Sequence, residues 1–124
     1  MGKFRELKVW QRGKDLAVYV YKVTSEGDFR KDFGLRDQIR RATVSIPSNI
    51  AEGDESGSDR QAIRFLRTAK GSTAEVLTQA IISREVGYLE EEAFHHIEAE
   101  CQTISGMLTR LIHSRTKALV ATTE

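Results

Sequence analysis

Arginines at helical spacing are the residues of this sequence that best suit the binding of an anion. Three lie within residues 36–41 and three within residues 60–67, and steps of three or four residues bring side chains to one face of a helix. Each guanidinium presents a planar fork that can hold a phosphate by two hydrogen bonds. The residues predicted to contact an RNA or DNA backbone are Arg36, Arg40, Arg41, Arg60, Arg64 and Arg67.

Salt bridging is the alternative use of these arginines. Asp37, Glu52 and Asp59 are interleaved with them, and a neighbouring subunit could supply further carboxylates. Each such pair removes a cation that would otherwise displace counterions from a nucleic acid. We favour salt bridging for this reason, and phosphate binding stays open as the second interpretation.

A second polar group, Ser48, Asn49 and Glu52, follows the single proline, Pro47. One interpretation is a catalytic or ligand-binding pocket. The other is that proline frees backbone groups, that neighbouring hydroxyl and amide groups satisfy them, and that the segment packs against a helix or another subunit. We favour the second, because no histidine lies nearby in the sequence to activate a serine. The sequence therefore predicts no catalytic residue and no enzymatic activity.

Histidine and cysteine give little support for a metal or cofactor. His95 and His96 are adjacent, so on a helix they point about 100° apart and do not easily share a metal. His96 has helical spacing to acidic residues, which is compatible with only a weak metal site. Cys101 falls on an apolar stripe, where a thiol behaves as a small hydrophobe. We expect neither a bound metal nor a cofactor.

The elements that must position these residues are helices. The 124 residues are 40% hydrophobic and 30% charged, as expected for one domain, and no segment alternates with the period of a strand. Apolar stripes predict helices at about 7–24, from 32 or 33 onward, about 58–86, and from 90–92 to 118. Trp10 and Tyr21 lie on a second stripe of the first helix, which predicts that both are core residues.

Short connections predict an all-α, up-down-up-down antiparallel four-helix bundle. We expect one domain over residues 1–118 and a frayed C-terminal tail at 119–124. Pro47 predicts a kink or break in the second helix near residues 43–46, because its ring removes a backbone donor. Gly71 predicts a close helix contact, which would compensate for its low helix propensity.

Charge and composition indicate where the protein acts. The formal net charge is only +1, yet residues 1–70 hold fifteen Lys and Arg against ten Asp and Glu, and residues 71–124 hold four against eight. This polarity suits self-association or an anionic partner. The single cysteine indicates a reducing compartment, and no apolar run approaches the roughly 20 residues that span a membrane. We expect a cytoplasmic protein with no membrane contact.

Three segments resemble the 23S rRNA intervening-sequence proteins. They are residues 7–11 (LKVWQ), residues 34–53 (GLRDQIRRATVSIPSNIAEG) and residues 65–75 (FLRTAKGSTAE), and the similarity extends from about Phe4 to about Ile112. The resemblance implies an up-down four-helix bundle that assembles into a ring of five subunits, without established enzymatic chemistry. A similar protein serves diversity-generating retroelements, in which a basic ring contacts nucleic acid and a reverse transcriptase.

The sequence thus predicts a non-enzymatic homo-oligomer, implied by the resemblance to be a pentamer, that acts as an assembly or adaptor protein. Its basic face would hold RNA, DNA or a protein partner. Two alternatives stay open: a purely structural module whose only partner is itself, and a small-ligand binder or enzyme that uses Ser48, Asn49 and Glu52.

Overall fold

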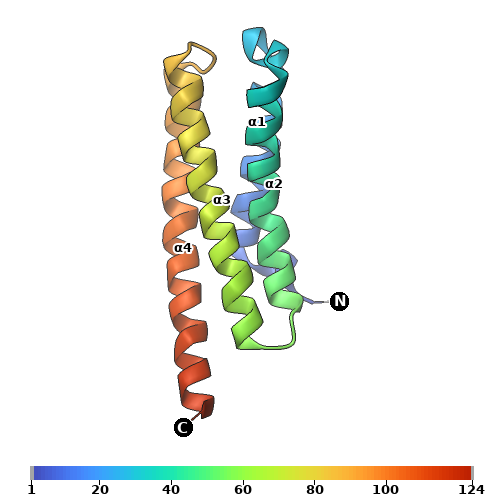
Figure 1. The fold of residues 1–124 in the computed structure, drawn as a ribbon, viewed down its shortest axis with the longest axis vertical. Helices are drawn as coiled ribbons and strands as arrows, with labels where there is room; N and C mark the ends of the chain where they lie inside the picture. The colour runs from blue at the N-terminus through green and yellow to red at the C-terminus, as the bar shows by residue number, and fades with distance from the viewer. Residues whose placement is uncertain (1, 124) are drawn as a thin grey trace.

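The computed structural model describes residues 2–123, which form four α-helices and two short 3₁₀ helices (Figure 1). The prediction of an all-α fold is confirmed, since no strand occurs among these residues. The elements in chain order are η1 (Phe4–Glu6), α1 (Lys8–Val23), η2 (Gly27–Lys31), α2 (Phe33–Glu55), α3 (Asp59–Glu85) and α4 (Glu91–Thr123).

The four helices form a bundle in which neighbours in sequence are neighbours in space. α2 packs on α1 and α3, α3 packs on α4, and α1 closes the bundle against α4. Short connections make successive helices antiparallel (Figure 1), which confirms the predicted up-down-up-down topology. α1 and α3 therefore occupy diagonal positions, and their outer sides point in different directions.

Side-chain and glycine signals set the helix ends. Asp32 Oδ1 accepts a hydrogen bond from the Leu35 amide at 3.1 Å, and Ser58 Oγ accepts one from the Gln61 amide at 3.2 Å, so both side chains satisfy amides that lack a helical partner. α3 ends before Gly87, as predicted. That residue has a φ of 87°, a left-handed value that glycine adopts without steric cost.

The predicted apolar stripes form the core. The residues in the middle of each stripe are less than a tenth exposed. They include Leu16 and Val20 of α1, Ile39, Ile46 and Ile50 of α2, Leu66, Ala69 and Val76 of α3, and Ile97, Cys101, Ile104 and Leu108 of α4. η2 adds Phe29, which is fully buried and which the periodicity of the helices does not predict.

Pro47 does not break α2. Of the two predicted outcomes, a kink or a break, the break is wrong, because α2 is one helix from Phe33 to Glu55. Ile46 and Ile50 on either side of the proline are buried in the core, and this packing offsets a cost of about 3 kcal/mol for proline inside a helix. α1 approaches closely here: a Cβ on Gly13 would lie 3.0 Å from Ile46 Cγ2 and 3.5 Å from Pro47 Cδ.

Two further predictions need correction. α4 continues to Thr123, so the predicted helix end at Ala118 is wrong; residues 119–123 contain neither glycine nor proline to stop it. The last turns of α4 extend beyond the α2–α3 connection (Figure 1), and Glu124 lies outside the described residues. Gly71 makes no close helix contact, because a Cβ there would find no atom of another helix within 4 Å.

Candidate functional site

An apolar groove follows the outer side of α1 and α2 and has a volume of about 970 Å³. Its apolar lining comes from both helices: Trp10, Ala17, Val18 and Tyr21 of α1, and Val44, Pro47 and Ala51 of α2. Three of these large side chains are substantially exposed, with exposed fractions of 47% for Val18, 46% for Tyr21 and 42% for Val44. The groove is therefore apolar surface that the bundle itself leaves uncovered.

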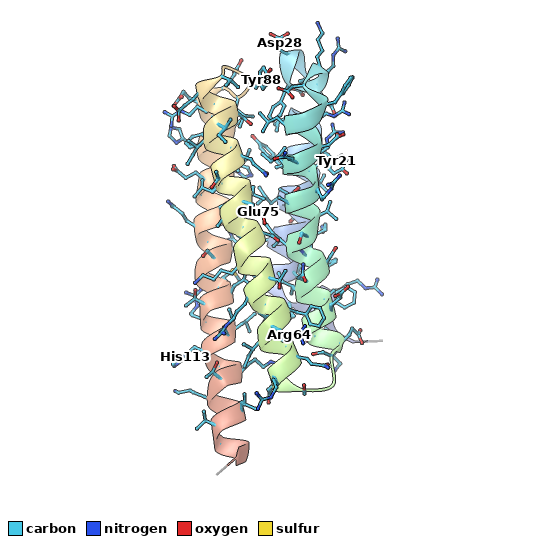
Figure 2. All side chains as sticks on the ribbon, in the orientation of Figure 1. Tyr21, Asp28, Arg64, Glu75, Tyr88 and His113 are labelled. Atoms are coloured by element: carbon cyan, nitrogen blue, oxygen red, sulfur yellow. The ribbon has the colours of Figure 1, made fainter. Side chains whose placement is uncertain are left out.

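The groove corrects the prediction that Tyr21 is a core residue, whereas Trp10 is partly buried and packs against the core, as predicted in part. Trp10 is half-buried and meets the Phe4 ring edge-on, with 5.3 Å between ring centroids. Tyr21 is exposed, and Figure 2 shows it at the edge of the bundle next to α2. The second apolar stripe of α1 faces outward along α2, because the first stripe already fills the core.

Charged residues line the same groove. Lys14, Lys22 and Glu26 belong to its lining, and the Tyr21–Val44 edge continues into a smaller depression that includes Arg41. Lys14 pairs with Asp15 at 2.7 Å. Lys22 and Arg41 make no ion pair with any carboxylate of residues 2–123. The charged lining is thus predominantly basic.

The predicted polar patch after Pro47 does not converge on one point. Asn49 Nδ2 donates to Ser45 O at 2.8 Å and to Ser45 Oγ at 2.9 Å, and Ser45 Oγ lies 2.8 Å from Ser72 Oγ on α3. Ser48 lines the α1–α2 groove, and Glu52 is exposed. Asn49 is therefore bonded within α2, Ser45 makes the contact with α3, and the three predicted side chains do not surround a common cavity.

Two of the six predicted arginines are engaged within the chain. Arg40 Nε donates to Thr24 Oγ1 at 2.8 Å, and its guanidinium lies 4.6 Å from the centroid of the Tyr21 ring. Arg36 Nε pairs with Asp37 at 3.0 Å, as the salt-bridge interpretation predicts, and its Nη1 donates to the Arg30 carbonyl. Both side chains tie the start of α2 to the connection from α1.

The remaining four arginines are exposed and carry no ion pair within the described part of the chain. Asp59, a predicted acidic partner, is instead bound by Arg115 of α4 at 2.9 Å. Arg60, Arg64 and Arg67 lie on the outer face of α3, in the half that starts at the α2–α3 connection, where Figure 2 labels Arg64. Arg41 borders the α1–α2 groove. The structure therefore brings together the α3 arginines and separates them from the α2 group.

The other half of the outer face of α3 has a different character, which the predicted helix pattern does not indicate. Glu75, Thr78, Ile82 and Glu85 follow one another at steps of three and four residues and are all exposed; Figure 2 labels Glu75. Ile82 is 46% exposed, and neither glutamate pairs with a cation of residues 2–123. In the sequence, Ile82 falls outside the apolar stripe of α3, and this position could have indicated an exposed apolar residue.

The histidines and the cysteine form no metal site. His95 lies between Glu91 at 3.3 Å and Glu98 at 3.6 Å, whereas the ring of His96 contacts the Tyr19 ring at a tilt of 51°, with 4.3 Å between centroids. No group of three or more His, Cys, Asp or Glu is placed to hold a metal within residues 2–123. Burial raises the pKa of the Cys101 thiol to about 12, and the Glu100 carboxylate adds to that shift. Cys101 is a core residue, as predicted, and holds its proton at neutral pH.

Fold and surface together define an antiparallel four-helix bundle with an apolar groove on one side and a charged outer face on α3. None of its helices within residues 2–123 combines the length and the apolar character needed to cross a membrane.

The chain belongs to the 23S rRNA-intervening sequence protein family, whose model matches residues 5–110. A solved structure of a protein of unknown function from the S23 ribosomal protein family of Bacteroides thetaiotaomicron has a similar fold, with a TM-score of 0.77 and 24% sequence identity. That similarity covers 84% of this chain and 97% of the other. No curated protein matches the chain.

Proposed function

We propose that this protein is a non-enzymatic, self-associating adaptor of the cytoplasm. Copies of the chain form a ring, five by the family resemblance, and the ring holds an RNA, DNA or protein partner. The observation that carries self-association is the α1–α2 groove, where Val18, Tyr21 and Val44 leave close to half of their surface in water. A contiguous apolar patch of this kind is typical of a protein–protein contact.

Contact with a nucleic acid is supported by the α3 arginines. Arg60, Arg64 and Arg67 lie on one exposed face, and no carboxylate of residues 2–123 neutralises them. Free cations at helical spacing can follow successive phosphates and release their counterions. The near-neutral net charge of +1 limits the strength of binding by one copy, so a ring that repeats the arginines would bind more tightly than a monomer.

Light scattering at several salt concentrations, with and without a short structured RNA, tests both the self-association and the nucleic-acid binding. We expect a stable mass several times the 14.0 kDa of one chain and RNA binding that weakens as salt rises. Arg60→Gln combined with Arg64→Gln should weaken binding and flatten its dependence on salt. The matched control is Arg30→Gln with Lys31→Gln, which removes two charges from η2 at the opposite end of the bundle and should leave binding unchanged.

The outcomes separate the alternatives. The full mass without RNA binding at low salt would favour a structural module or an adaptor for proteins, and a monomer would contradict self-association. A small-ligand binder or enzyme that uses Ser48, Asn49 and Glu52 gains no support from the geometry, because Asn49 is committed to Ser45.

A further inference from the structure

We infer that the α1–α2 groove of one copy binds the C-terminal half of α3 of the next copy. This inference rests on the proposed self-association and specifies its two surfaces. The second surface, called the α3 ridge below, consists of Glu75, Thr78, Ile82 and Glu85. The contact is head-to-tail: each copy uses its groove toward one neighbour and its ridge toward the other.

Shape and apolar character are the first reasons. The groove is a hollow between two helices with exposed Val18, Tyr21 and Val44. The ridge is the convex side of one helix and exposes 46% of Ile82. Ile82 is the one large apolar side chain of the ridge, and seating it in the groove of a neighbouring copy would remove it and the groove's apolar lining from water.

Charge complementarity is the second reason. Lys14 and Lys22 line the groove together with Glu26; Lys14 is paired with Asp15, whereas Lys22 makes no ion pair within residues 2–123. Glu75 and Glu85 flank Ile82 on the ridge. At a rise of about 1.5 Å per residue, the two lysines are roughly 12 Å apart along α1, and the two glutamates are roughly 15 Å apart along α3. Both glutamates lack a cationic partner within the described residues, so a neighbouring copy can supply one.

The same features argue against a contact between two identical surfaces. Two grooves facing each other would bring lysines against lysines and leave two hollows unfilled, whereas two ridges would oppose glutamates. Since α1 and α3 lie diagonally across the bundle, the groove and the ridge of one molecule cannot meet. In a row of copies joined by such contacts, the first copy has an unused ridge or groove and the last copy has the other one. These two unused surfaces can bind each other, and the row then closes into a ring.

Charge reversal tests the inference by mass measurement. Lys14→Glu with Lys22→Glu makes the groove acidic, and Glu75→Lys with Glu85→Lys makes the ridge basic. Either pair alone should reduce the wild-type mass to that of a monomer, because like charges then oppose each other at every contact. All four substitutions in one chain should restore the wild-type mass, since opposite charges again meet at each contact.

The control is Arg64→Glu with Arg67→Glu, which makes the same change in net charge as the groove pair, at the other end of the outer face of α3, and should keep the wild-type mass. Circular dichroism checks that every variant is folded. The assignment of the two surfaces is wrong if each reversed pair keeps the full mass. It is also wrong if the fourfold variant is monomeric while the wild type is oligomeric. In both cases self-association itself still holds. A monomeric wild type would overturn the proposed function as well.

Discussion

Replacing Arg40 with alanine should destabilise the bundle by about 2 kcal/mol, whereas the same change at Arg64 should cost less than about 0.5 kcal/mol. Arg40 Nε donates to Thr24 Oγ1 at 2.8 Å, and Thr24 is fully buried. A hydrogen bond from a charged group contributes about 1.5–3 kcal/mol, and its loss leaves the buried hydroxyl oxygen without this donor. The contacts of Arg40 with Ser25 and with the Tyr21 ring lie at the surface and add little.

Urea unfolding followed by the helical circular dichroism signal gives both free energies, and thermal unfolding should show a decrease in Tm of about 8 °C for Arg40→Ala. The partners of Arg40 are hydroxyl and carbonyl oxygens, so the loss should persist at high salt, where ion pairs between exposed groups are screened. Measurement at two protein concentrations separates a loss within one chain, which does not depend on concentration, from a loss of association. If Arg40→Ala and Arg64→Ala had equal effects on the free energy of unfolding, the division into arginines that bond within the chain and arginines that do not would be wrong.

Three further predictions concern the packing of the bundle. Gly53→Ala should destabilise it by about 1–2 kcal/mol, because the new Cβ would lie 3.3 Å from Phe65 Cβ. Gly71→Ala should stabilise it by up to about 1 kcal/mol. If urea unfolding showed Gly53→Ala to be the more stable of the two variants, the packing described at these glycines would be wrong. Cys101 should react slowly with Ellman's reagent in the native protein and quickly in urea, since its pKa is raised to about 12. The unfolded thiol ionises at about 8.5, so the protein should lose stability as pH rises from about 9 toward 12. Cys101→Ala should lose less over this range, although Tyr19, whose pKa burial also raises, still contributes to the loss. Asp32→Ala removes both the cap of α2 and the acceptor of the Tyr88 hydroxyl and should cost at least about 1 kcal/mol in urea unfolding. Tyr88→Phe is the control that removes only the second bond, and no difference between the two variants would contradict a contribution from the cap.

The helices could be predicted because their apolar stripes and end signals are local. Ile39, Ile46 and Ile50 recur at helical steps and are buried as expected, and Gly87 ends α3 at the predicted place. The continuous helix through Pro47 could not be predicted in the same way. Proline has a local cost, and whether packing on both sides offsets it depends on residues far away in the sequence.

The candidate surfaces could be predicted only in part, because spacing specifies a face of a helix and not what lies opposite that face. The spacing of Arg36 and Arg40 indicates a shared face, yet that face meets the end of α1, where Thr24 and Ser25 accept hydrogen bonds from Arg40. Arg64 has the same local pattern and faces solvent. Likewise, the second apolar stripe of α1 predicted a core position for Tyr21, and only the arrangement of α1 beside α2 shows that Tyr21 lines an open groove.

The outer face of α3 connects the two proposed contacts. Its N-terminal half carries Arg60, Arg64 and Arg67, and its C-terminal half carries Glu75 and Glu85 around Ile82. If the second half seats in the groove of a neighbour, every added copy places another set of arginines at a fixed position around the ring. Three phosphate contacts give one copy a salt dependence of only about 2–3 in the slope of log K against log salt, and linked copies raise affinity without any new type of contact. The groove-reversed protein, Lys14→Glu with Lys22→Glu, retains all three arginines, so weak RNA binding with a shallow salt slope is expected from it. Unchanged binding by that monomer would separate nucleic-acid contact from assembly.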